Sequence, residues 1–86
     1  MSTYKAAISV TLKKSVLDPQ GQTVLHALDS LNFKEAKKIR VGKYFELTVD
    51  GKDRKSVEDR IREMCSKLFI NPVIEEYAII SLEEAK

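Results

Sequence analysis

Two residues of this sequence could act as a catalytic base or nucleophile, His26 and Cys65, and each is the single residue of its kind. A catalytic histidine needs a nucleophile or an orienting carboxylate, and a metal site needs further ligands. The spacing around His26 suggests none of these, and helical periodicity puts it on a polar face. Cys65 falls on an apolar stripe near a helix C-terminus, where the helix dipole opposes thiolate formation. We interpret the first as a surface residue and the second as a core residue.

Glu75 and Glu76 are adjacent carboxylates, but neighbouring residues of a strand point to opposite faces of a sheet and cannot form an acid–base pair. The sequence therefore predicts no active site of its own, and we expect no bound cofactor or metal.

An anion site is the next candidate, because Lys13-Lys14 precede a helix that begins at Asp18. Asp18 already supplies negative charge there, and Gly21 is the only glycine nearby. Acylphosphatases share the strand order described below but require a glycine-rich loop with an arginine, which this loop lacks. We interpret the segment as a structural helix cap.

Residues 40–47 have a faint likeness to the RNA-binding strand of RRM domains, which presents stacking aromatics. Phe45, however, shares the apolar parity of its neighbours, and Glu46 would repel phosphate. We expect no nucleic-acid partner.

The elements that position these residues follow from hydrophobic periodicity. Residues 4–13 alternate as a half-buried strand. Asp18-Pro19 is a helix start, and Asn32 ends that helix. Its apolar stripe consists of Val24, Leu25, Leu28 and Leu31.

Residues 36–49 carry apolar residues at odd positions, interrupted at Gly42-Lys43 by what we interpret as a bulge or a tight turn between two strands. A second helix begins at Asp53 or Ser56 and cannot continue past Asn71-Pro72. The stripe of this helix is Val57, Ile61, Met64, Cys65 and Leu68. The last strand runs from 73 to 82, with Ile74, Ala78, Ile80 and Leu82 on one side and Tyr77 and Ile79 on the other.

The order strand, helix, strand, strand, helix, strand predicts an α+β, ferredoxin-like βαββαβ fold with two helices on one face of a four-stranded antiparallel sheet. Both faces of the last strand are apolar. The sheet face without helices therefore needs a partner.

Eighty-six residues make one small domain, residues 1–86, whose limited core favours self-association. No apolar run is long enough to span a membrane, no signal-peptide core follows the N-terminus, and the single cysteine permits no disulfide. We expect a cytoplasmic protein without a membrane partner. Residues 1–43 carry eight Lys/Arg against three Asp/Glu, and residues 44–86 carry seven against ten. This asymmetry suits an acidic partner surface or head-to-tail self-association.

Three segments carry a family resemblance in their order and spacing: Val16-Leu17-Asp18-Pro19-Gln20-Gly21, Arg40-Val41-Gly42-Lys43 and Asn71-Pro72-Val73-Ile74-Glu75. Together, and over nearly the whole chain, they resemble PurS, the small subunit of formylglycinamide ribonucleotide amidotransferase (phosphoribosylformylglycinamidine synthase) of purine biosynthesis. The resemblance implies a ferredoxin-like, self-associating, non-catalytic subunit. It would bridge a glutaminase subunit, which releases ammonia, and an ATP-dependent synthetase subunit, and help convey ammonia between them.

Partner contacts are predicted from the same segments. Gly42 interrupts a regular strand pattern and is flanked by Arg40 and Lys43, which suggests a docking turn; a plain hairpin with solvated cations is the alternative. The full predicted set is Asp18, Gln20, Arg40, Gly42, Lys43 and Asn71. We expect a homodimer or a higher even oligomer. The alternative function is an ACT-like small-molecule-binding regulatory domain, although Gly21 lies late for the ligand loop of that class.

Overall fold

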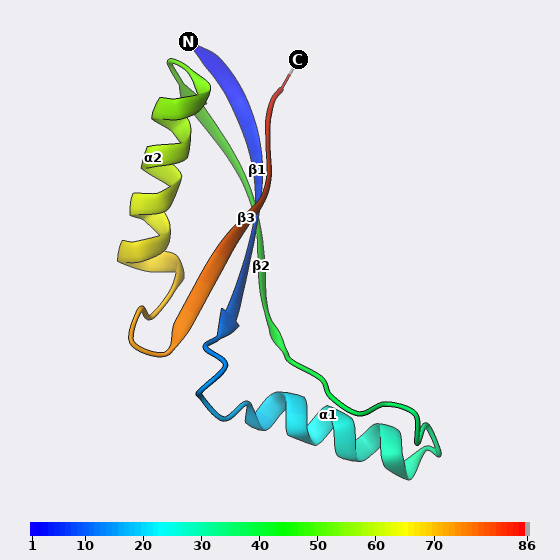
Figure 1. Ribbon diagram of the computed structural model, residues 1–86. Helices are drawn as coiled ribbons and strands as arrows, with labels where there is room; N and C mark the ends of the chain where they lie inside the picture. The colour runs from blue at the N-terminus through cyan, green and yellow to red at the C-terminus, as the bar shows by residue number, and fades with distance from the viewer. Residues whose placement is uncertain (86) are drawn as a thin grey trace.

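The computed structural model describes residues 1–85 and shows an α+β chain built on a three-stranded antiparallel sheet (Figure 1). The strands lie in the order β2-β1-β3. Their bounds are β1 Ser2–Leu12, β2 Gly42–Gly51 and β3 Glu75–Glu84. The helices are α1 Pro19–Ser30, α2 Arg54–Met64 and the π-helical turn η1 Cys65–Phe69.

The core lies between one face of the sheet and α2. The predicted alternation of the first strand is confirmed, since Ile8 and Val10 are fully buried on this face. From α2, Val57 and Ile61 are equally buried against them. Asp53 caps α2 by accepting a hydrogen bond from the Ser56 N–H at 2.8 Å. Apolar burial between the two elements therefore supplies the main stabilisation of the sheet region.

The prediction of four strands is wrong. Residues 36–41 form no strand in the described chain, and Gly42 opens β2 instead of marking a turn. The apolar residues of this segment pack elsewhere: Ile39 lines a groove with Leu25 of α1, and Val41 lies beside Val24. Their odd parity thus reflects contact with a helix and not pairing within the sheet.

The prediction that both helices cover one sheet face is also wrong. α1 makes no substantial contact with any strand or with α2 in the described chain, and it runs crosswise beyond the end of the sheet (Figure 1). We call residues 13–41, which comprise α1 and its flanking segments, the arm. Within α1 only Gly21 is buried, whereas Val24 is 42% exposed, and Leu31, just past its end, is 68% exposed.

The end of α1 is nevertheless well defined. Asn32 adopts a left-handed conformation with φ of 72°. The Phe33 N–H donates to the Leu28 carbonyl at 2.9 Å, and the Asn32 N–H donates to the Asp29 carbonyl at 3.0 Å. This is the Schellman arrangement that satisfies the last carbonyls of a helix, and it confirms Asn32 as the helix stop.

The π turn changes which side chain enters the core at the end of the second helix. An extra residue per turn rotates the register after Cys65. Leu68, predicted on the buried stripe, is 79% exposed as a result. Phe69 replaces it and stacks on Phe45 of β2, with ring centroids 4.5 Å apart and planes 8° apart.

A bulge likewise corrects the predicted parity of the last strand. Ala7 pairs with Ser81 while Ile8 pairs with Ile79, so Ile80 is an inserted residue. Tyr77, Ile79 and Leu82 therefore all face the core. Ile80 is left on the other side of the sheet, 59% exposed. Both parities of this strand are apolar largely because the register shifts along it.

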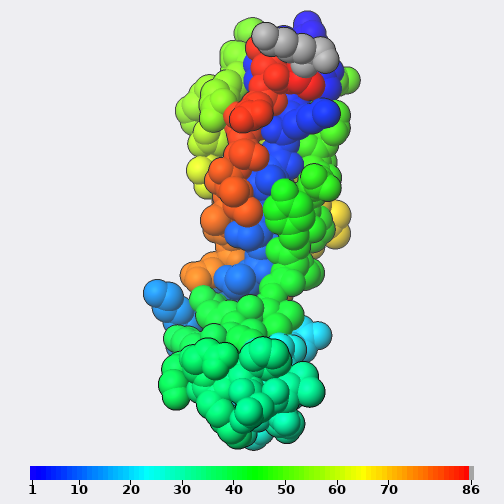
Figure 2. Space-filling view, turned by 90° about the vertical axis from the view of Figure 1, so that its right-hand side faces the viewer, coloured from blue at the N-terminus to red at the C-terminus, as the bar shows by residue number. Residues whose placement is uncertain are grey.

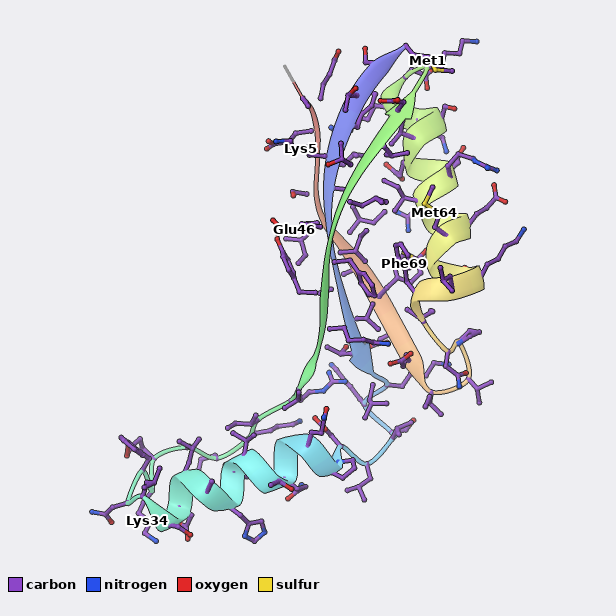
Figure 3. All side chains as sticks on the ribbon, turned by 180° about the vertical axis from the view of Figure 1, so that it is seen from behind. Met1, Lys5, Lys34, Glu46, Met64 and Phe69 are labelled. Carbon is purple, nitrogen blue, oxygen red and sulfur yellow. The ribbon has the colours of Figure 1, made fainter. Side chains whose placement is uncertain are left out.

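The face of the sheet opposite α2 is uncovered, and we call it the open face (Figure 2). Lys5 and Glu46 point outward from it, on the side toward which the arm projects (Figure 3). The chain measures 52 × 30 × 14 Å with a radius of gyration of 16.5 Å, against about 12 Å for a compact domain of this length. Its accessible surface of 6405 Å² exceeds by about 1,200 Å² the area usual for its mass.

Candidate interaction surfaces

Asp18 links the start of α1 to the segment that returns over this helix. Its Oδ1 accepts a hydrogen bond from the Gly21 N–H at 3.0 Å, the predicted helix cap. Its Oδ2 accepts from the Val41 N–H at 2.8 Å, which ties the returning segment to the start of α1. The backbone hydrogen bond from Gly21, then that from Val41, lower the pKa of Asp18 below its ordinary value, and the charge of Arg40 lowers it further.

Gly21 permits this close approach. A Cβ on residue 21 would lie 2.5 Å from the Ile39 carbonyl oxygen and 2.6 Å from Asp18 Oδ2. Only a residue without a side chain fits between the helix and the returning segment. The returning segment itself fills the space beside Gly21, which lies within α1. This position therefore does not support the ligand loop of the ACT-like alternative.

Three residues of the predicted contact set lie where β2 begins and where the chain turns into β3, and each contacts another part of the chain. They are Gly42, Lys43 and Asn71. A Cβ on Gly42 would collide with the Val10 carbonyl oxygen in the adjacent strand. Lys43 Nζ lies 3.5 Å from Glu75 Oε2, while Glu75 Oε1 accepts from the Asn71 N–H at 2.7 Å. The break in pattern at Gly42 thus has a structural reason, close contact between β2 and β1.

Asn71 shapes the turn into β3. Its Oδ1 accepts from the Val73 N–H at 3.1 Å, and its carbonyl accepts from the Glu75 N–H at 2.7 Å. These bonds form a turn of the Asx type, which re-aims the chain after the helix. Its role as a partner contact stays a prediction, as it does for the rest of the set.

The structure separates the six predicted contact residues into two groups. Asp18, Gln20 and Arg40 belong to the arm. Gly42, Lys43 and Asn71 lie at the end of the sheet, where Gly42 begins β2 and Glu75 links Lys43 with Asn71. Of the six, Gln20 and Arg40 are exposed in the arm and engaged in none of the ion pairs or side-chain hydrogen bonds found within residues 1–85. These two are the best placed to meet another molecule.

The arm contains a basic groove that the sequence analysis did not identify. It has a volume of about 430 Å³ and gathers Lys14, Lys37, Lys38 and Arg40 around an apolar floor. The two dibasic pairs at 13–14 and 37–38 are its sequence signal. Nothing in the sequence indicates that Lys14 and the second pair line one groove, because this depends on the return path of the chain over α1.

The two candidate catalytic residues lie apart. His26 is exposed on α1. Cys65 is fully buried where α2 passes into η1, and burial raises the pKa of its thiol. Within residues 1–85, no three His, Cys, Asp or Glu side chains gather as a metal site would require. None of the helices described there is long and apolar enough to cross a membrane.

The open face is mixed rather than apolar throughout. Small residues fill its centre, with Ala7 at 9% exposure, and Tyr44 and Ile80 flank them at 61% and 59%. Lys5 and Glu46 line a shallow depression on the same face. Glu46 pairs with Ala7 across β2 and β1, so charged and small residues lie side by side on this face. Such a mixture of polar and apolar residues is usual for non-obligate protein interfaces.

Comparison with known proteins identifies the family of this chain. The PurS family model, described as phosphoribosylformylglycinamidine (FGAM) synthase, matches residues 5–83. The chain belongs to the PurS family.

Curated PurS relatives match across most of their lengths. The Bacillus subtilis phosphoribosylformylglycinamidine synthase subunit PurS is 50% identical over 74 residues, which cover 86% of this chain and 87% of that protein. The Methanocaldococcus jannaschii subunit of the same name is 40% identical over 76 residues, which cover 88% and 92%.

Solved PurS structures share the α+β fold. A structure of Bacillus subtilis PurS superposes with a TM-score of 0.85 at 48% identity, over 94% of this chain and 99% of that one. A chain in a structure of PurLQS from Thermotoga maritima superposes with a TM-score of 0.84 at 32% identity, over 99% and 100%. The matched regions include the arm as well as the sheet.

Proposed function

We propose that this chain, as one PurS-like domain over residues 1–86, is the small non-catalytic subunit of phosphoribosylformylglycinamidine synthase in purine biosynthesis. It bridges a glutaminase subunit and an ATP-dependent synthetase subunit and aids transfer of ammonia between them, in the cytoplasm. The observation that carries the proposal is the match over nearly the full chain to a PurLQS structure.

The geometry supports a role in binding. The candidate base and nucleophile lie on separate elements, one exposed and the other buried. The molecule instead offers surfaces, namely the open face and the arm that projects on the same side (Figure 1). A subunit that positions two enzymes needs such surfaces more than a pocket.

Reconstitution tests this role. Purified glutaminase and synthetase subunits are mixed with and without this chain, and formation of the amidine product is followed with glutamine as the nitrogen source. We expect the chain to be required. The control is the same mixture supplied with ammonium ions, in which the synthetase should work without it. Full glutamine-dependent activity without the chain contradicts the proposal.

Self-association is part of the proposal. The chain has about 1,200 Å² more accessible surface than a compact protein of its mass, and a standard interface buries about 800 Å² per partner. A second copy related by two-fold symmetry brings its arm to the open face of the first, so each sheet gains the cover that its own α1 does not give. We propose a homodimer or a higher even oligomer on this ground.

Light scattering after size exclusion checks the oligomer. We expect a mass of at least twice 9.8 kDa at micromolar concentration. Ile80→Lys, on the open face, should lower that mass while the far-ultraviolet spectrum stays unchanged. The matched control is Leu68→Lys, at a position that is even more exposed and lies on η1, outside the sheet. A 9.8 kDa wild-type species at every concentration contradicts self-association.

A further inference from the structure

The basic groove of the arm concentrates charge from distant parts of the sequence. Lys14 comes from the turn after β1, and Lys37, Lys38 and Arg40 come from the segment that returns over α1. All four side chains belong to exposed residues. Cations held close together repel one another unless an anion approaches, so the groove has a built-in preference for a negatively charged ligand.

In the part of the chain that the structure describes, none of the ion pairs joins these four side chains to a carboxylate. Ion pairs within residues 1–85 engage other cations, such as Lys34 of the arm with Asp29 and Lys43 of β2 with Glu75. The remaining pairs lie on α2 and η1. Asp18 lines the groove and interacts with the charge of Arg40, but its two oxygens accept hydrogen bonds from backbone N–H groups, and one carboxylate does not balance four cations. The four lysine and arginine side chains are therefore available to another molecule.

The chemistry of the groove argues against a small phosphate ligand. Phosphate sites at helix N-termini use free backbone N–H groups. Here the Gly21 and Val41 N–H groups already donate to Asp18 and are not free to bind a phosphate. The floor adds a different feature, since Val16, Leu25 and Ile39 line the groove between the cations.

Cations around an apolar floor match a polypeptide segment that carries several carboxylates and an aliphatic side chain. We propose that the arm groove docks an acidic segment of another subunit of the synthase complex, with an aliphatic residue seated on the floor. This inference rests on the proposed function, because it presupposes that the chain assembles with larger subunits. Burial of an aliphatic side chain on the floor would contribute to the affinity for the segment, and the positive charges would raise the rate at which it associates.

Fluorescence anisotropy tests the inference with a labelled synthetic peptide of alternating glutamate and leucine. We expect the affinity of the wild-type chain to fall at least about tenfold when salt is raised well above 0.1 M. Lys37→Glu combined with Lys38→Glu should weaken binding by about tenfold or more. The matched control combines Lys52→Glu with Lys67→Glu, which changes net charge equally but lies outside the groove. It should change affinity less than about twofold.

Several results would overturn the inference. Equal losses in both double variants would mean that net charge alone attracts the peptide. Equal binding of a glutamine–leucine peptide would remove the charge argument, and displacement by inorganic phosphate or ATP would point to a small anion. A drop in oligomer mass confined to the groove variant would assign the groove to a second copy of this chain.

Co-elution with purified glutaminase and synthetase separates this inference from the proposed function. We expect the groove variant to co-elute at least about tenfold more weakly than the control. If the chain is required for glutamine-dependent synthesis but both variants assemble equally, only the groove inference fails. If the larger subunits are fully active without the chain, the proposed function fails and the inference that depends on it fails too.

Discussion

Substitution of Gly21 by alanine should loosen the arm, although helix propensity alone predicts the opposite. Alanine in a helix is favoured over glycine by about 1 kcal/mol. At this position, however, the new Cβ would lie 2.5 Å from the Ile39 carbonyl oxygen, whereas ordinary contact begins at 3.4 Å. The returning segment must therefore withdraw by about 0.9 Å.

The expected magnitude follows from the two atoms that crowd the site. Overpacking costs about 1–3 kcal/mol, and the upper end applies because one atom is a backbone carbonyl and the other is a carboxylate fixed by two hydrogen bonds. After the propensity gain is subtracted, the arm loses about 2 kcal/mol, which corresponds to about a 30-fold larger opening equilibrium. Since α1 makes no substantial contact with the sheet, opening of the arm need not unfold the strands.

Amide hydrogen exchange measures this effect residue by residue. In Gly21→Ala, the Val41 amide should exchange about 30-fold faster, while the Ile8 and Val10 amides in β1 keep their protection. Thr23→Ala is the matched control, because it places alanine at an exposed position of the same helix. It should leave Val41 protected. Unchanged or greater protection of Val41 in Gly21→Ala would refute the steric argument.

Further predictions concern the core and titratable groups. Ile61→Ala, at a fully buried site, should cost about 2–5 kcal/mol and lower the Tm by about 8 °C or more at fixed protein concentration; a smaller shift would mean that α2 is not the main cover of the sheet. The pKa of Asp18 in the folded chain lies below its ordinary value of 3.8, so its contribution to the stability of the arm is present above that value and is lost as pH falls through the folded pKa. Exchange of the Val41 amide, corrected for intrinsic pH effects, should therefore rise in acid, and Asp18→Asn should abolish that pH dependence. Burial raises the pKa of the Cys65 thiol, so a thiol reagent at pH 8 should react with it only as fast as the chain unfolds; immediate reaction would contradict its burial.

Local signals in the sequence determined where elements begin and end. Asp18-Pro19 contains both a side chain that caps a helix and a residue that needs no donor at the first helical position, and the helix begins there. Asn32 tolerates a left-handed backbone and ends it. These features depend on neighbours a few residues away, and for that reason a sequence read without a structure locates them. The family could be identified for a similar reason, since short segments at fixed spacing carry it.

Side-chain parity was reliable only until a residue was inserted. One extra residue at Ile80 in β3, and one extra residue per turn in η1, each moved a later side chain to the other face. Leu68 and Phe69 exchanged roles in this way. A bulge or π turn is chosen by how well the next side chains fill the core, and that depends on residues distant in sequence.

Only the tertiary structure decided where α1 and residues 36–41 lie. The apolar residues of α1 and of residues 36–41 could pack either against the sheet or against each other. The sequence pattern does not say which of these surfaces they bury against. Asp18 settles the matter by bonding to Val41 while Gly21 lets the segment approach, so the two pack together beyond the sheet. The same pairing brings Lys14 beside Lys37 and Lys38 and leaves the open face bare. Fold class and family thus follow from short-range chemistry, whereas the surfaces available to partners follow from contacts that close over long stretches of chain.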